Sequence, residues 1–210
     1  MDNKDILKIL NFHKLCCKLK TVVRSGWKCW CVEADRVESI AEHIFGTCML
    51  TVGILSANKN LELDANKIIA MMALHECEEI FIGDITPYET EKMKTKAEKG
   101  RQAVEQLFAE FDMPNNFKDL IAEFEAQVTS EAKFARRVDK LEADIMAYSY
   151  EQNINYNRID KKILENEIIV KAINEGATCV GDYFVSSDMD KYDELFASIA
   201  KAAREYYLKK

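Results

Sequence analysis

The densest group of potentially reactive side chains follows an apolar run over residues 68–74, which leads into His75, Glu76 and Glu79. In a helix of about 3.6 residues per turn, His75 and Glu79 lie on one face, and Glu76 lies about 100° around the axis. Charged groups inside a buried helix are costly unless they are paired, hydrogen-bonded or bound to a metal ion. The group therefore indicates a metal centre, provided that other segments supply further ligands.

Two other segments contain suitable ligands. Ser39 with Glu42 three residues later is a helix capping box, which places His43 in the first turns of a helix expected over about 39–58. Asp139 lies at the edge of the apolar stripe of a helix expected over about 129–151, an unusual position for a residue of poor helix propensity. This mixed set of imidazoles and carboxylates suits a divalent transition metal better than calcium or a thiolate zinc site: His43, His75, Glu76 and Asp139.

The order of these ligands on separate helices resembles that of the HD-domain metal-dependent phosphohydrolases. More closely, the chain resembles the HD-family 5′-deoxynucleotidases, which dephosphorylate deoxyribonucleoside 5′-monophosphates. The similarity covers about residues 19–151 and includes Arg36-Val-Glu-Ser-Ile-Ala-Glu-His43 and Gly83-Asp84. It implies an all-α HD-domain helical bundle and a phosphoric monoester hydrolase. It also implies that the four ligands hold a divalent cation, which would be Mn, Co, Fe, Zn or Mg.

One ligand departs from the family pattern. The His-Asp doublet of the family is His75-Glu76 in this chain. The extra methylene of glutamate moves the carboxylate by more than an ångström, so the helix must shift, the side chain must take a different rotamer, or a water must intervene. The departure affects metal geometry and preference, but His43, His75 and Asp139 remain.

The resemblance also implies roles for residues around the metal. Glu79 would act as general acid or base, and Asp84 would be catalytic and would contact the sugar 3′-hydroxyl. Arg24 would clamp the phosphate by bidentate hydrogen bonds, and Trp27 would form a wall of the nucleoside pocket. Each has a simpler interpretation: Asp84 as a turn residue, Arg24 as a surface charge and Trp27 as a core residue. The segment Lys94–Lys99 is expected to be only a charged helix face.

Composition and helical periodicity favour an all-α fold. Seven Gly and two Pro in 210 residues argue against an all-β protein. We expect one domain over residues 1–210, with core motifs at about 19–151 and C-terminal helices at 161–208. The other expected helices span about 5–20, 65–82, 91–111 and 116–127.

Charge and cysteine content restrict the partners and the compartment. A net charge of −7 argues against nonspecific binding to a nucleic acid polymer or an anionic membrane, and leaves a small nucleotide substrate possible. No apolar run reaches the ~18–20 residues of a membrane span, and the N-terminus lacks signal-peptide features. Seven cysteines without a compact framework favour reduced thiols. We expect a cytoplasmic protein and a homodimer.

Two other functions remain open at this stage. One is a non-catalytic nucleotide-binding or sensory HD protein that lost turnover through Glu76. The other is an HD phosphohydrolase with a different substrate, such as a cyclic nucleotide or a nucleotide tetraphosphate, although such enzymes usually carry more histidines or basic residues than this chain.

Overall fold

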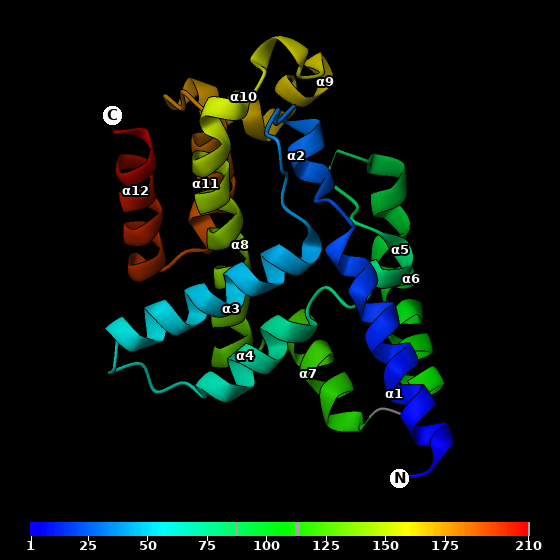
Figure 1. The fold of residues 1–210 in the computed structure, drawn as a ribbon. Coiled ribbons are helices and arrows are strands. Elements are labelled where there is room, and N and C mark those ends of the chain that lie inside the picture. Colours follow the sequence, from blue (N-terminus) through cyan, green and yellow to red (C-terminus); the bar gives the residue numbers. More distant parts are fainter. Residues whose placement is uncertain (87, 112–113, 210) are drawn as a thin grey trace. The chain divides into compact units, whose positions relative to one another are not determined.

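The computed structural model describes residues 1–86, 88–111 and 114–209, and its regular elements there are all helical. The expectation of an all-α fold is therefore confirmed. Short 3₁₀ turns and two isolated β-bridges, Val23 with Ser39 and Val32 with Ile154, supplement the helices. The α-helices, coloured along the chain in Figure 1, are α1 (Asn3–Cys16), α2 (Ser25–Cys29), α3 (Ile40–Ala57), α4 (Ala65–Leu74), α5 (Glu79–Ile82), α6 (Thr90–Phe111), α7 (Asn115–Ala126), α8 (Ser130–Tyr150), α9 (Lys161–Leu164), α10 (Glu167–Asn174), α11 (Val180–Asp188) and α12 (Glu194–Leu208).

The chain divides into two compact units. The first comprises residues 1–25 and 38–135, and the second comprises residues 26–37 and 136–210. Helix α8 begins in the first unit and continues into the second. The expectation of a single domain over residues 1–210 stays a prediction.

In the first unit, α3 packs on α4 and α4 packs on α7, while α5 and α1 both pack on α6 (Figure 1). A small apolar cluster of Leu19, Ile40 and Ile80 joins the start of α3 to α5. The predicted capping box is confirmed, because the Ser39 hydroxyl accepts from the Glu42 amide and the Glu42 carboxylate accepts from the Ser39 amide. The cap and the cluster fix the first turn of α3, which carries His43.

The helix expected over residues 65–82 is interrupted. Asp64 caps α4 by accepting from the Lys67 amide, and Gly83 ends α5 with a φ of 70°. Between Leu74 and Glu79, however, the amides bond to carbonyls three residues back, as from Cys77 to Leu74 and from Glu79 to Glu76. Such i→i+3 bonding winds the backbone more tightly than an α-helix. The assumption that His75 and Glu76 project from a regular helix is therefore wrong.

The second unit has its own aromatic core. Trp27 is 2% exposed, and its ring lies 5.1 Å from that of Tyr150 and 5.7 Å from that of Phe184 between centroids. Trp30 is fully buried beside Tyr183. Offset and tilted aromatic pairs of this kind add stability beyond the area that they bury. They fasten the short segment of residues 26–37 to α8 and α11.

Helix α3 combines a buried face with an exposed apolar one. By length and composition alone it is apolar enough to cross a membrane, although one such helix is weak evidence because core helices of soluble proteins pass the same test. His43, Thr47 and Thr51 lie on its fully buried face. The buried polar face indicates that this side of α3 packs in the interior of the first unit.

Candidate metal centre

Two histidines from different helices meet in the interior of the first unit. His43 on α3 is fully buried, and His75 at the C-terminal end of α4 is 3% exposed. Their Nε2 atoms are 3.4 Å apart. His75 Nδ1 lies 2.7 Å from the Met72 carbonyl oxygen, which can only accept, so Nδ1 carries the proton and Nε2 of the neutral ring presents its lone pair.

A buried carboxylate lies near the other nitrogen of the His43 ring. Its Nδ1 lies 4.0 Å from Oε1 of Glu38, which is 6% exposed. A carboxylate on this side favours the tautomer with the proton on Nδ1, which leaves the Nε2 lone pair directed at His75. This second-sphere arrangement is typical of metal-binding histidines.

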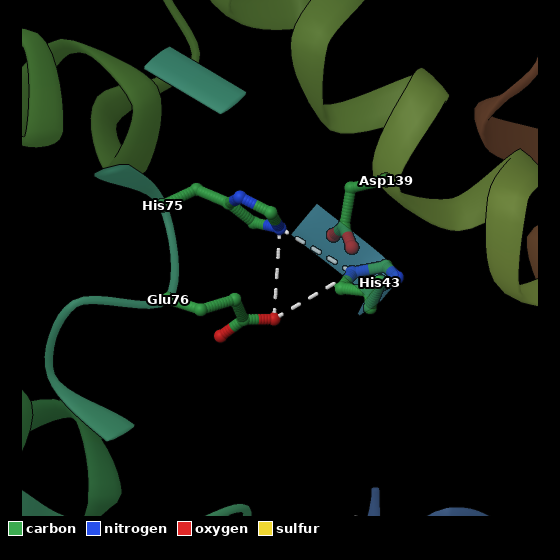
Figure 2. A group of neighbouring side chains, drawn as sticks. All are labelled: His43, His75, Glu76 and Asp139. Atoms are coloured by element: carbon green, nitrogen blue, oxygen red, sulfur yellow. Dashed lines mark hydrogen bonds and ion pairs between the residues drawn. The ribbon is translucent and has the colours of Figure 1, made fainter. Parts of the chain in front are cut away.

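Glu76 completes a group of three donors. Its Oε1 lies 3.6 Å from His75 Nε2 and 3.8 Å from His43 Nε2. Figure 2 shows these three atoms directed at one another. Glu76 and His75 are adjacent in the turn between α4 and α5, and their side-chain atoms reach the same point. One ligand atom from each of the three residues lies within 4.8 Å of the other two.

The donor set fits a divalent cation. Two ligands bound at ~2.1 Å and separated by a right or tetrahedral angle are ~3.0–3.4 Å apart, close to the spacings seen here. A carboxylate oxygen that faces two imidazole nitrogens in the interior is costly without a positive charge. Imidazole with carboxylate suits divalent transition metals. The site is therefore compatible with a divalent metal of unspecified identity.

Asp139, the remaining predicted ligand, belongs to the second unit. It lies on α8, one turn beyond Ala135, where the first unit ends. Its side chain is buried, and Oδ2 lies 3.4 Å from Arg136 Nη1 one turn earlier (Asp139 is also labelled in Figure 2). The buried position agrees with the sequence-based expectation, and the role of Asp139 as a ligand stays a prediction.

Arg24 lies beside the three donors. Its Nη1 is 4.0 Å from Glu76 Oε1, and its backbone amide bonds to the Glu38 carbonyl, next to the bridge between Val23 and Ser39. The Arg24 side chain is 18% exposed. The bridge thus holds the Arg24 backbone at the start of α3, and the guanidinium, partly open to solvent, lies beside Glu76, whereas the simpler interpretation would leave this group on the free surface.

Glu79 is a buried carboxyl with one unused oxygen. It is 2% exposed, and its Oε2 has no hydrogen-bond partner among the described residues. Burial raises the pKa of Glu79 to about 10, and the carboxylates of Glu76 and Asp84 act in the same direction. Without a metal the carboxyl is therefore protonated at neutral pH, and a bound cation would lower its pKa. Such a group can donate or accept a proton.

Two predicted substrate residues have structural contacts. Asp84, in the first unit, accepts a hydrogen bond from the Ser25 amide through Oδ2, and the Ser25 hydroxyl donates to the Asp84 carbonyl. Asp84 therefore joins the loop after α5 to the segment that carries Arg24. Trp27 packs in the core of the second unit, as described above. The roles of Asp84 in sugar recognition and of Trp27 as a pocket wall stay predictions.

The sequence analysis missed Lys96 in this environment. We expected residues 94–99 to be only a charged helix face, but Lys96 Nζ lies 3.6 Å from Glu79 Oε1. A signal was present: Lys96, Gly100, Ala103 and Leu107 follow one another at helical spacing, and the last three are buried. A lysine on the continuation of an apolar stripe needs a partner, which here is Glu79.

We predict that the raised pKa of Glu79 makes the metal-free protein less stable as the pH rises. A carboxyl whose pKa is higher in the folded state stabilises that state below its unfolded pKa, and this contribution is lost as the pH rises through the folded pKa. Glu79→Gln should therefore raise Tm relative to the wild type more at pH 9 than at pH 5, in chelator. The difference in Tm between Glu79→Gln and the wild type should be larger at pH 9 than at pH 5 by at least about 2–4 °C, which is the shift expected for ~1 kcal/mol. Exposed Glu98→Gln is the control; a gain for Glu79→Gln that does not change with pH would contradict the assignment.

The site can be compared with those of known proteins. A model of the HD domain family matches residues 16–175. Over 148 residues the chain is 33% identical to the 5′-deoxynucleotidase HDDC2 of Xenopus laevis, covering 69% of this chain and 70% of the relative. It is 31% identical to the 5′-deoxynucleotidase HDDC2 of Dictyostelium discoideum, covering 68% and 77%.

Solved structures share the fold. One is a predicted metal-dependent phosphohydrolase from Magnetospirillum magnetotacticum, with a TM-score of 0.64, 19% identity, and coverage of 97% of this chain and 95% of that one. Another, from Pyrococcus horikoshii, has a TM-score of 0.66 and 23% identity, and covers 95% and 98%. At these identities the likeness concerns the fold alone. The family model spans well over half of the chain, and its span includes the two histidines that meet in the first unit: the chain belongs to the HD-domain family.

Proposed function

We propose that this protein is a metal-dependent 5′-deoxynucleotidase, which hydrolyses deoxyribonucleoside 5′-monophosphates to a deoxyribonucleoside and phosphate. The observation that carries the proposal is the group formed by the His43 and His75 Nε2 atoms and Glu76 Oε1, with a guanidinium beside it. Relatives at about 30% identity that bear the name 5′-deoxynucleotidase support the substrate class.

In this proposal His43, His75, Glu76 and Asp139 hold one divalent cation, which is Mn, Co, Fe, Zn or Mg. When bound, such a cation neutralises phosphate oxygens and lowers the pKa of a coordinated water toward neutrality. The histidines are suited to this because their Nδ1 atoms face a carbonyl and a carboxylate, which fixes the rings.

Arg24 binds the phosphate in this proposal. A dianionic phosphate needs positive charge on more than one side, and a guanidinium supplies two parallel donors to phosphate oxygens. The Arg24 side chain retains some solvent exposure and lies next to Glu76, so it is near the centre and still accessible. It would also stabilise charge that develops on the phosphoryl group in the transition state.

Glu79 serves as the acid or base. Its buried Oε2 lacks a partner among the residues that the structure describes, so it is available to a reacting oxygen. Because burial raises the pKa of the carboxyl, Glu79 is suited to giving a proton to the departing 5′-oxygen. Asp84 contacts the sugar 3′-hydroxyl and disfavours a ribose 2′-hydroxyl, and Trp27 lines the nucleoside pocket; the fixed position of the Asp84 loop against Ser25 supports the first role.

The alternative functions keep distinct signatures. A non-catalytic sensory protein would bind nucleotide without releasing phosphate, and a different HD phosphohydrolase would prefer another nucleotide. No observation in the described residues favours either one. We place the protein in the cytoplasm, which its seven unpaired thiols support, and we expect no nucleic acid polymer or membrane as a partner because of the net charge of −7.

A phosphate-release screen with Mn, Co, Fe, Zn and Mg tests the function. We expect deoxyribonucleoside 5′-monophosphates to be hydrolysed faster than their ribose counterparts.

Glu79→Gln should retain the metal but lose about 10²–10⁴-fold in kcat, because the amide cannot exchange the required proton. Metal content by mass spectrometry is the control. Equal rates on deoxyribose and ribose substrates would contradict the role of Asp84. If no metal supported phosphate release, the non-catalytic nucleotide-binding protein would be favoured. Loss of metal from Glu79→Gln would mean that Glu79 is a ligand.

We predict that Glu76→Asp binds the metal more weakly, although it restores the doublet of the family. Glu76 Oε1 reaches within 3.6–3.8 Å of both histidine nitrogens from the present backbone, and aspartate is one methylene shorter. Metal titration should show a loss of at least about tenfold, equivalent to ~1.4 kcal/mol. The same change at Glu78, two residues later, is the matched control. Tighter binding by Glu76→Asp would mean that the site is still shaped for aspartate.

We also propose that the protein is a homodimer that pairs through the exposed face of α3. Phe45, Met49 and Val52 follow helical spacing there and are 68%, 51% and 46% exposed. Apolar residues gathered on one face mark an interaction surface, and the negative net charge favours a second copy over an anionic membrane. Light scattering should give a dimer for the wild type and a monomer for Phe45→Glu. Dissociation by Leu7→Glu on α1 instead would place the interface elsewhere.

A further inference from the structure

Lys96 on α6 makes two contacts with the segment that follows the metal ligands. Its Nζ lies 3.6 Å from Glu79 Oε1 and donates to the Ile85 carbonyl at 3.4 Å. The side chain is 28% exposed, whereas the neighbouring Lys92 and Lys99 lie on the exposed face of the helix. One ammonium group therefore joins the proposed acid or base on α5 to the loop that carries Asp84.

The position of Lys96 is set by the packing of α6 on α5. A Cβ added at Gly100, one turn after Lys96, would lie 3.5 Å from the Glu78 side chain, so the two helices approach closely there. Lys96 occupies the same stripe as Gly100, which directs its chain toward α5. An ammonium on this face is favourable only when it is paired.

The charges around Glu79 come from three elements. The carboxyls of Glu76 and Glu78 precede Glu79 in the chain, and that of Asp84 follows in the next loop. The positive charge of Lys96 faces these carboxyls from α6. Burial by itself lowers the pKa of Lys96, but the carboxylates of Glu79, Glu76, Glu78 and Asp84 together raise it above its ordinary value. Lys96 therefore stays cationic over the working pH range and acts as the counter-charge of the group.

The two carboxyl oxygens of Glu79 therefore have different surroundings. Oε1 faces the Lys96 ammonium, whereas Oε2 is buried without a hydrogen-bond partner in the described part of the chain. A carboxyl held through one oxygen cannot rotate freely, so the other oxygen keeps a fixed direction. Fixed donors and acceptors accelerate a reaction because they need no reorganisation during it.

We propose that Lys96 is a positioning residue of the phosphohydrolase reaction: it holds Glu79 through Oε1, directs Oε2 to the reacting oxygen, and fixes the Asp84 loop through the Ile85 carbonyl. The inference rests on the function proposed above and extends it, because it connects proton transfer to sugar recognition. Lys96 does not touch the substrate in this arrangement, and it acts through Glu79 and the loop.

Lys96→Met tests the proposal, because methionine fills the space of the lysine stem without its charge. With dAMP as substrate in the metal-loaded enzyme, we expect kcat to fall by at least about tenfold with little change in KM, as for a group that acts in the transition state alone. The preference for dAMP over AMP should narrow as the Asp84 loop loosens. Lys96→Arg should restore part of kcat, and Lys99→Met, which removes an exposed lysine from the same helix, should match the wild type.

A metal-free measurement separates this proposal from the function on which it rests. Carbon-13 NMR of glutamate carboxyls, with Glu79 assigned by its loss in Glu79→Gln, should show a higher pKa for Glu79 in Lys96→Met than in the wild type. An unchanged titration together with an unchanged kcat would overturn the proposal. A rise in KM at constant kcat would overturn it too, because Lys96 would then bind phosphate directly. An inactive wild type would refute the proposed function, and the titration would still decide whether Lys96 controls Glu79.

Discussion

The first unit depends on an arrangement that is unfavourable without a cation. Two imidazole nitrogens and one carboxylate oxygen face a common point in the interior, at 3.4–3.8 Å from one another. None of them has a proton to offer the others once each histidine keeps its proton on Nδ1. Such a group persists in the fold because the surrounding helices impose it, and the same constraint makes it a preformed binding site for a divalent metal.

Local backbone structure imposes this arrangement from two sides. The capping box at Ser39 and Glu42 fixes the start of α3, three residues before His43, and the apolar cluster around Ile40 holds that start against α5. On the other side, the i→i+3 turn between Leu74 and Glu79 carries both His75 and Glu76. Adjacent residues leave such a turn about 120° apart, against about 100° in an α-helix. The conformation of the Glu76 side chain therefore brings its Oε1 to within 3.6 Å of His75 Nε2.

Other interactions in the first unit concern the charges around Glu79 rather than metal coordination. Glu79 is buried among three other carboxyls, which with burial raise its pKa, and Lys96 reaches them from α6. Burial therefore favours the protonated form of Glu79, and the Lys96 ammonium limits how far the pKa rises. Because the ammonium faces Oε1, only Oε2 remains without a partner among the described residues. Arg24 supplies a further positive charge beside Glu76. The chain carries a net charge of −7, so the cations at the site are a local exception that suits a phosphate.

The sequence by itself determined the helical class, the cap at Ser39, and the residue types of the centre, because these depend on short-range spacing and on the cost of burying charge. It did not determine the break after Leu74, since no proline or glycine marks it and the bonding there is a response to packing. It also did not reveal the pairing of Lys96 with Glu79, because the two are 17 positions apart and meet only where α6 packs on α5. Contacts between helices depend on how the apolar faces fit together, and only the tertiary structure decides that.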